Sequence, residues 1–230
     1  MDSNSLAARD AAVIAKIQTL RFNPLAATGG SGSYLQDEDG RRILDLSASA
    51  TAAGLGYGHP AVIEAMVKAA RDMAGASLLM IPNEPATALA EKLLAITPGQ
   101  GERRVWYGHS GSDANDAAMR VASAATGRGR FISFIGSYHG CLSGSMSISG
   151  HTAMTHSLPR PGLVLLPYPD RYRKRFSAEE ALAMLDYQFE TTCPPDQVAA
   201  MFIEPILSDG GLIVPPDGFL KALEERCRRH

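Results

Sequence analysis

The chain has 230 residues, which is enough for one large domain that buries a substantial core. Hydrophobic residues make up 45% and charged residues 20%, and the formal net charge is −2, a balance that argues against nucleic-acid or membrane partners. Three widely spaced cysteines without a CxxC pair predict neither a disulfide framework nor a zinc site, so we expect a reducing, cytoplasmic setting and no bound metal.

The N-terminal region is predicted to form a helix followed by a β-hairpin. Val13, Ile14, Ile17 and Leu20 have the spacing of one helical face, and this helix is expected to end near residues 22–24. The stretch "GSYLQDEDGRRILDLS" surrounds an Asp-Gly pair at 39–40, which predicts strands at 34–35 and 43–46 joined by a tight turn. The first residues lack the features of a signal peptide, and no apolar run approaches the ~18 residues of a membrane span.

The glycine-rich run "GLGYGHP" leads into a predicted helix from residue 61 to about residue 74. Its buried side is expected to hold four apolar side chains, Val62, Ile63, Met66 and Val67. We assign residues 1–60, the first helix and the hairpin, to part of a smaller α+β domain. Residues 61–230 are assigned to the first part of a larger domain.

Beyond this helix the predicted elements alternate between helix and strand. Helices are expected at 84–96, 113–126, 178–190 and 217–230, the last with Phe219, Leu220 and Leu223 facing inward, and strands at 104–107, 130–135, 162–166 and 198–203. This alternation predicts an α/β fold with a mostly parallel sheet covered by helices on both faces. Because such a helix normally leads into a further parallel strand, we interpret the sequence as incomplete at the C-terminus.

The stretch "GHSGSDAN" at 108–115, between a predicted strand and a predicted helix, allows two functional interpretations. As a variant of the G-x-S-x-G turn it would make Ser110 the nucleophile of a serine hydrolase, but Ser112 stands where the closing glycine belongs. As a phosphate-binding helix start it offers capping-box spacing between Ser110 and Asp113, an open backbone at Gly111 and a hydroxyl at Ser112. An ordinary capped helix without a ligand fits the same residues.

Two further stretches follow predicted strands at the same edge of the sheet. "FIGSYHG" contributes Tyr138, an aromatic that could stack on a flat ring or only pack, and "MFIEPILSDGG" places Glu204 at a strand terminus. Ligands bind at the carboxyl edge of open α/β sheets, so these features together favour a ligand site. Nearby, Cys141 has no evident base partner and is interpreted as incidental rather than nucleophilic, and the basic run "RYRKR" at 171–175 as a solvated loop.

In order and spacing, the stretches "LDLSASATAAGLGYGHP", "GHSGSDAN", "GSYHG" and "EPILSDGG" resemble the class III aminotransferases. These are fold-type-I enzymes that use pyridoxal phosphate, and they include 4-aminobutyrate, ornithine and similar ω-amino-acid aminotransferases. The resemblance covers residues 23–230 and implies the first part of that fold. Members are typically homodimers with the active site at the subunit interface, so the resemblance also implies a homodimer.

The resemblance implies a cofactor-binding set in this chain. Gly111 and Ser112 are similar to the pair that holds the cofactor phosphate, and Tyr138 to the aromatic that stacks on the pyridine ring, with His139 beside it. Glu204 is similar to the acid near the edge of the ring.

Other matching positions concern the substrate, and some depart from the family pattern. Asp209 falls where many members carry a glutamate that engages a mobile arginine, and Ala50 falls at a substrate-side position that is usually bulkier. The "ILS" run before Asp209 is closer to the dialkylglycine decarboxylase branch, so a decarboxylating transaminase is an alternative. Yet that branch usually has tryptophan at the position of Tyr138, and the small Ala50 leaves room for a substrate larger than 4-aminobutyrate.

The resemblance places two essential groups beyond the last predicted helix: an aspartate in a "DEV"-like run and the lysine that forms a Schiff base with the cofactor. None of the lysines here lies in a matching motif. We therefore expect transfer of an amino group from an ω-amino acid to a 2-oxo acid only with a complementing C-terminal half, and no activity from these 230 residues alone. The rivals are the serine hydrolase and a non-catalytic relic of the fold.

Overall fold

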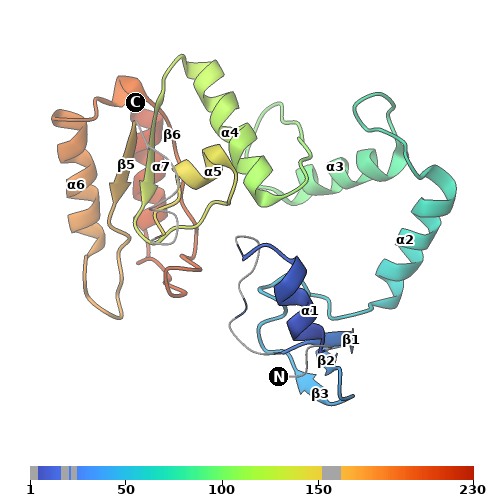
Figure 1. The fold of residues 1–230 in the computed structure, drawn as a ribbon. Coiled ribbons are helices and arrows are strands. Elements are labelled where there is room, and N and C mark those ends of the chain that lie inside the picture. Colours follow the sequence, from blue (N-terminus) through green and yellow to red (C-terminus); the bar gives the residue numbers. More distant parts are fainter. Residues whose placement is uncertain (1–4, 17–20, 22–24, 152–161) are drawn as a thin grey trace. The chain divides into compact units, whose positions relative to one another are not determined.

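The computed structural model describes residues 5–16, 21, 25–151 and 162–230. The chain divides into two compact units, residues 1–91 and 92–230, and each is described by itself. Figure 1 shows their elements coloured along the sequence. The domain boundary that we placed near residue 60 stays a prediction.

The N-terminal unit holds a short helix and a small antiparallel sheet. Helix α1 (Leu6–Val13) begins at the cap residue Ser5 and ends at Val13, since Ile14 is already extended. The prediction of a longer first helix is therefore wrong at Ile14, while Ile17 and Leu20 lie outside the described residues. Side-chain spacing alone could not show where the backbone leaves the helical conformation.

The predicted hairpin is confirmed. Strands β2 (Tyr34–Asp37) and β3 (Arg42–Leu44) pair in antiparallel register, with Leu35 opposite Ile43, and Gly40 takes the positive φ of 79° that the turn requires. A strand that was not predicted, β1 (Ala27–Ser31), pairs with β2 and completes the order β1-β2-β3. Its sequence, ATGGS, has no apolar alternation, so only pairing with β2 identifies it.

A run of four residues after this sheet has a left-handed backbone. Residues 48–51 have φ values of 48°, 49°, 53° and 71°, although none of them is glycine. Asp45 holds the run, because its carboxylate accepts hydrogen bonds from the N–H of Ser47, the N–H of Ser49 and the hydroxyl of Tyr57. These bonds, that of Tyr57 first, lower the pKa of Asp45 to about 2.

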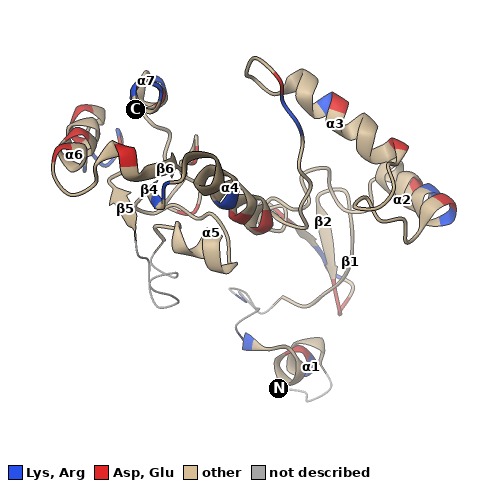
Figure 2. Ribbon diagram, turned by 90° about the horizontal axis from the view of Figure 1, so that it is seen from above, with Lys and Arg blue, Asp and Glu red and all other residues tan. Residues whose placement is uncertain are grey.

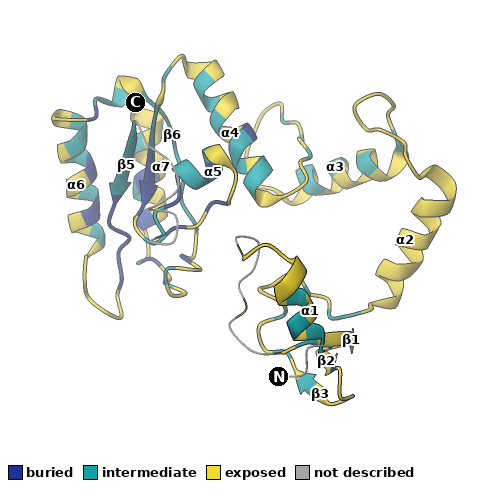
Figure 3. Cartoon of the chain, in the orientation of Figure 1, coloured by how far each residue is buried: buried dark blue, intermediate teal, exposed yellow. Residues whose placement is uncertain are grey.

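Two helices follow, and their apolar side chains are not buried. Helix α2 (Pro60–Met73) and helix α3 (Glu84–Ile96) begin and end close to their predicted bounds. The predicted buried face of α2 is wrong, because Val62, Ile63, Met66 and Val67 are between 41% and 67% exposed. Figure 3 shows α2 in the colour of exposed residues along its length. Helical periodicity identifies an apolar face but does not supply the element that covers it.

The C-terminal unit is built on a three-stranded parallel sheet in the order β5-β4-β6. Its strands are β4 (Arg130–Phe134), β5 (Leu163–Leu166) and β6 (Val198–Met201), and its helices are α4 (Gly111–Thr126), α5 (Ser143–Ser147), α6 (Ala178–Glu190) and α7 (Phe219–Arg229). The predicted strand at 104–107 is wrong: the segment joins no sheet in the described part of the chain, because a strand needs a backbone partner as well as a suitable sequence.

Alternation along β4 separates the two faces of this sheet. Ile132 and Phe134 are fully buried and pack with residues of α6 and α7, and the rings of Phe134 and Phe219 meet edge to face. Ser133, between them in sequence, points to the opposite face. On that face α4 contacts β6 and α5. Helices on both faces of a parallel sheet confirm the predicted α/β architecture.

The last helix joins this core through one side only. Phe219 and Leu223 are 1% and 4% exposed, but Leu220 is 38% exposed, so its predicted inward position is wrong. Since adjacent helical residues lie 100° apart, Leu220 turns out of the contact that Phe219 makes. Arg226 on the same helix forms an ion pair with Asp186 of α6, and Figure 2 shows the opposite charges of these two helices.

Among the described residues, no helix combines the length and the apolar character needed to cross a membrane. The same part of the chain contains no group of three or more histidine, cysteine or acidic residues arranged to hold a metal ion.

Candidate functional site

Helix α4 begins with a side-chain cap that accounts for Ser110. The Ser110 hydroxyl oxygen accepts the N–H of Asp113 at 3.2 Å, as the capping spacing predicts. The carboxylate of Asp113 does not return to Ser110 but accepts the N–H of His109 at 3.0 Å, so the capping box is only half formed. The Ser110 hydroxyl thus acts as the cap of this helix.

The first two amides of α4 are available to a ligand. Within the described residues, the N–H groups of Gly111 and Ser112 donate no hydrogen bond, and a side chain added at Gly111 would meet no atom within 4 Å. The Ser112 hydroxyl oxygen accepts the N–H of Cys141 at 3.0 Å, which leaves its own hydrogen free to donate. Two amides, one hydroxyl and the positive end of the helix dipole together suit an anion.

The loop after β4 lies directly against this helix start. Gly140 has a φ of 133°, and a β-carbon there would lie 2.4 Å from Ser112 Oγ, so only glycine permits the approach. Tyr138 in the same loop is 37% exposed, and its hydroxyl lies 2.8 Å from Cys141 Sγ. This contact first, then burial and electrostatic interaction with Cys141 and Asp209, raise the pKa of Tyr138 to about 12.

His139 points away from the surface, into a buried group of serines on the face of the sheet opposite Phe134. Its Nε2 atom lies 3.2 Å from Ser133 Oγ, which lies 3.1 Å from Ser137 Oγ. Its backbone N–H donates to Ser149 Oγ. Burial lowers the pKa of His139, and the charge of Glu204 only partly opposes this shift. The imidazole is therefore neutral at neutral pH.

Glu204 joins the loop after β6 to the loop after β4. One carboxylate oxygen accepts the N–H of Tyr138 and the other accepts the N–H of Ser208, both at 2.7 Å. Tyr168, at the end of β5, donates its hydroxyl to the carbonyl oxygen of Glu204 at 3.0 Å. Three parallel strands thus contribute to one polar edge.

The structure brings together most of the residues predicted from the sequence. Ser112 contacts the loop of Tyr138 and His139, with Gly111 next to it in the chain, Glu204 binds that loop, and Asp209 is close enough to affect the pKa of Tyr138. Ala50 belongs to the N-terminal unit, in the left-handed run of residues 48–51, and is exposed.

Sequence reasoning missed the buried serines of this edge. Ser133 and Ser137 are 0% exposed, and only Ser133 had a signal in the sequence, as a serine inside the apolar strand RFISF. Cys141 is exposed and contacts Tyr138. The basic run at 171–175 is exposed, as predicted, with Arg173 paired to Asp170.

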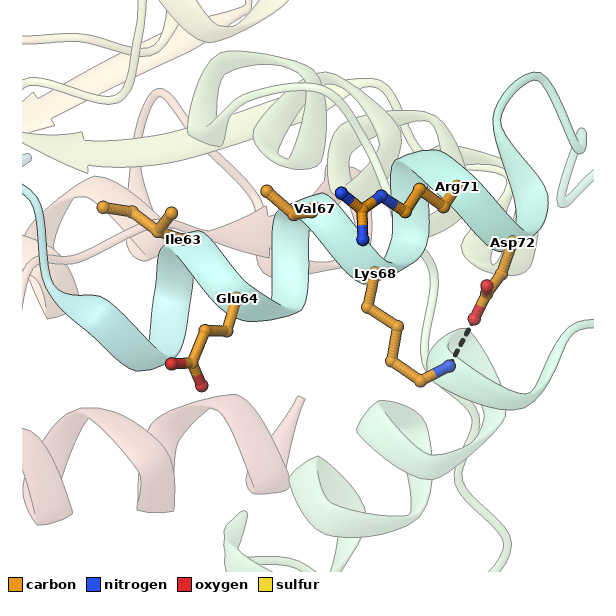
Figure 4. A pocket seen from close by; sticks show the side chains of 6 residues that line it. All are labelled: Ile63, Glu64, Val67, Lys68, Arg71 and Asp72. Atoms are coloured by element: carbon orange, nitrogen blue, oxygen red, sulfur yellow. Dashed lines mark hydrogen bonds and ion pairs between the residues drawn. The ribbon is translucent and has the colours of Figure 1, made fainter.

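A separate hollow of about 490 Å³ lies along α2 in the N-terminal unit. Figure 4 shows its six lining residues, all from that helix: Ile63, Glu64, Val67, Lys68, Arg71 and Asp72. Lys68 and Asp72 form an exposed ion pair one helical turn apart. Such pairs occur on many solvated helices, so this hollow has no feature of a chemical site.

The fold and the polar edge define an α/β protein. At the carboxyl end of its parallel sheet, the first N–H groups of α4 are available to bind an anion. Residues 17–230 match the model of the family described as Aminotransferase class-III, and the chain belongs to this family.

Individual relatives agree with this assignment. The chain is 36% identical to an isoleucine 2-epimerase of Lentilactobacillus buchneri over 94% of its length, and 35% identical to an acetylornithine aminotransferase of Mycolicibacterium smegmatis over 90%. These alignments cover 50% and 48% of the two relatives, so the chain spans about half the length of the curated relatives it matches.

A solved structure, the taurine:2-oxoglutarate aminotransferase of Bifidobacterium kashiwanohense in complex with PLP and glutamate, has a TM-score of 0.87 and 26% identity. The match covers 97% of this chain and 52% of that one.

Proposed function

We propose that this chain supplies the phosphate-binding and ring-stacking part of a pyridoxal-phosphate-dependent aminotransferase. The reaction would transfer an amino group from an ω-amino acid, such as 4-aminobutyrate or a similar amine, to a 2-oxo acid. The observation that carries the proposal is the start of α4, where unpaired amides and the Ser112 hydroxyl lie beside the Tyr138 loop. Membership of the class III family supports the same reaction class.

The donor set fits the phosphate of the cofactor. Gly111 and Ser112 would bind it through their amides, and Ser112 also through its hydroxyl, because these donors have no protein acceptor among the described residues. When bound, the cofactor supplies an electron sink that stabilises negative charge at the substrate carbon. The chain's own residues bind it, orient it and exclude water.

Other residues would set the position of the ring. Tyr138 is exposed enough to stack on a flat ring, and its raised pKa keeps the phenol protonated at neutral pH. His139 lies beneath this loop as a neutral imidazole, so it adds no charge to the cofactor site. Glu204 holds the Tyr138 loop through one hydrogen bond and its own loop through a second, and Asp209 would stand where many family members carry a glutamate that engages a mobile arginine.

The proposed substrate side of the site includes Ala50. Ala50 would border the substrate, and its small side chain accommodates a group larger than that of 4-aminobutyrate. We expect the full-length protein to accept bulky amines better than its Ala50→Leu variant. The ratio of kcat/KM values for a bulky and a small amine measures this preference.

Removal of the Ser112 hydroxyl tests phosphate binding. The Ser112→Ala variant of the full-length protein should bind pyridoxal phosphate about tenfold more weakly, since one strong hydrogen bond to a dianion is lost. Ser177→Ala is the matched control, because Ser177 likewise caps a helix start, that of α6, and no hydrogen bond among the described residues joins it to Ser112 or Tyr138. Equal affinities of Ser112→Ala and the unmodified protein in equilibrium dialysis would refute the phosphate assignment.

Amino-acid racemisation is a second candidate. An isoleucine 2-epimerase is 36% identical over nearly the whole chain, and that similarity is the observation that favours it. Both reactions would begin with removal of a proton from the carbon that bears the amino group, so the two would share the same cofactor edge. Incubation of the full-length protein with a single amino-acid enantiomer in deuterated water, with and without a second 2-oxo acid as acceptor, separates them. Racemisation yields the other enantiomer without the acceptor, whereas amino transfer needs the acceptor and yields the 2-oxo acid of the donor together with the amino acid of the acceptor.

We further propose a homodimer, as the family resemblance implies, in the cytoplasmic setting that the cysteine pattern indicates, completed by a C-terminal half that carries the reactive lysine. Sedimentation of the full-length protein, with and without pyridoxal phosphate, tests the dimer. A monomer at micromolar concentration under both conditions would contradict it.

A further inference from the structure

Three side chains on one face of α4 bind the backbone of the segment 139–145. We call Ser112, Asn115 and Asp116 the polar face of α4, because positions three and four apart lie on one side of a helix. Asn115 Nδ2 donates to the carbonyl oxygen of His139 at 2.7 Å, and Asp116 Oδ1 accepts the N–H of Ser145 at 2.6 Å. With the Ser112 bond to Cys141, the helix is tied to both ends of the segment.

Two glycines let this segment approach the polar face. A β-carbon at Gly140 would lie 2.4 Å from Ser112 Oγ, and one at Gly144 would lie 2.8 Å from Asp116 Oδ1. Such contacts are shorter than real β-carbons allow. The backbone therefore lies directly on the two side chains, and its distance from α4 is fixed by them.

Tyr138 immediately precedes this tied segment and is held on its other side as well. Glu204 accepts its N–H, and Ser137, the preceding residue, is locked by Ser133 and by the N–H of Gly150. Hydrogen bonds therefore hold the backbone both before and after Tyr138, whose ring is exposed. Asn115 and Asp116 follow the first residue of α4 by about one helical turn, and their side chains bind the backbone of residues 139 and 145.

We infer that Asn115 and Asp116 are positioning residues that fix the Tyr138 ring relative to the amides of Gly111 and Ser112. The inference rests on the proposed function, in which these amides bind the phosphate and Tyr138 stacks on the ring of one ligand. In this proposal Asn115 and Asp116 bind the backbone of the loop and not the ligand. They set the distance between the two parts of the site.

A fixed distance matters only to a ligand that uses both parts at once. For such a ligand the second contact is intramolecular, and its contribution falls when the two parts are no longer in register. A ligand that uses one part alone does not sense the distance. Loss of the polar face should therefore weaken a phosphorylated pyridine ligand much more than a simple phosphate.

Calorimetric titration of the full-length protein without its cofactor tests this difference. The ligands are inorganic phosphate and pyridoxine 5′-phosphate, which has the ring and the phosphate but no aldehyde to react with a lysine. The variants are Asp116→Ala, Asp116→Asn, in which the amide oxygen can still accept the N–H of Ser145, and Asn115→Ala. Arg120→Ala, an exposed change on the same helix, is the matched control.

We expect Asp116→Ala to weaken pyridoxine 5′-phosphate about tenfold or more and inorganic phosphate less than about threefold. Asp116→Asn should restore most of the affinity, and Arg120→Ala should change neither ligand. Asn115→Ala removes the amide that donates to the carbonyl oxygen of His139, and it should show the same selective loss of pyridoxine 5′-phosphate affinity to a smaller extent. If Asp116→Ala does not fold, Asn115→Ala provides the test.

Different results would overturn the proposed function and the positioning role of Asn115 and Asp116. If the unmodified protein binds neither ligand, the proposed function fails and the positioning role fails with it. If it binds pyridoxine 5′-phosphate but the Asp116 and Asn115 variants lose both ligands equally, or lose neither, the positioning role alone is overturned. Hydrogen exchange at the Ser145 amide, faster in Asp116→Ala and unchanged in Arg120→Ala, is the supporting structural result.

Discussion

The two units use similar side chains in opposite ways. In the unit of residues 92–230, alternation along β4 places Phe134 in a closed apolar core and Ser133 in a buried polar network. In the unit of residues 1–91, Met66 lies on an equally regular apolar face of α2, yet it is 67% exposed. The comparison teaches that a repeating pattern determines which side chains share a face, whereas burial depends on an element from elsewhere in the chain.

The two units also differ in what keeps their unusual backbone conformations in place. Gly140 takes a φ of 133° where the chain crosses Ser112, so its strain accompanies a tight contact. Residues 48–51 take left-handed φ values although each has a β-carbon, which makes that conformation unfavourable. Most of these residues are exposed. One unusual conformation is required by packing, and the other is maintained by the hydrogen bonds of Asp45.

The largest difference in stability should come from truncating one apolar side chain on each of the two apolar faces. Phe134→Ala removes a fully buried ring and should cost about 3–5 kcal/mol of unfolding free energy. Met66→Ala removes an exposed side chain and should change stability by no more than about 0.5 kcal/mol. Urea denaturation of the full-length protein measures both. A loss at Met66 close to that at Phe134 would show that α2 is covered in solution.

Replacing one glycine in each unit by alanine separates the cost of a steric contact from the cost of the backbone conformation. Gly140→Ala forces a side chain into both an unfavourable φ and the atoms of Ser112, and should cost about 2–4 kcal/mol. Gly75→Ala, at a φ of 84° with no atom within 4 Å, has only the backbone cost of about 1 kcal/mol. Equal midpoints in urea for the two variants would mean that the loop does not lie against α4.

The sequence predicted those features whose causes are local. The Asp39-Gly40 pair fixed the hairpin, Ser110 marked the start of α4, and the apolar pattern of α6 gave its bounds. For the site, glycine and serine at a helix start predicted donors for an anion, because these residue types leave the first amides open.

The features that sequence reasoning missed depend on distant partners. The segment 104–107 has the composition of a strand but no described pairing partner, and Leu220 has the spacing of a core residue but turns away from α6 and Phe134. The left-handed run depends on Tyr57, twelve residues from Asp45. In the site, Asn115 and Asp116 looked like ordinary helix residues, and only the chain crossing at 139–145 shows what they bind.

A smaller effect concerns the buried imidazole. Burial lowers the pKa of His139 below the value of 6.5 that applies to the unfolded chain. As the pH falls through 6.5, the unfolded state takes up a proton first, so the contribution of His139 to stability is present above 6.5 and is lost toward the folded pKa. The melting temperature should fall between pH 7.5 and pH 5.5, and less in His139→Gln, where this position does not titrate. An identical fall in both proteins would assign the loss to other groups.

The smallest expected effect has the opposite sign and tests the other kind of strain. A left-handed φ costs a non-glycine residue about 1–2 kcal/mol, and glycine in its place costs about 0.5–1 kcal/mol in chain entropy. Ala50→Gly, at a φ of 53°, should therefore stabilise the protein by about 0.5–1 kcal/mol. The same change at the exposed Ala124 of α4 should destabilise it by about 1 kcal/mol, because helical φ values favour alanine. Urea midpoints that move in opposite directions would show that the strain at 48–51 exists in solution, and a loss of stability in both variants would show that the run is not left-handed there.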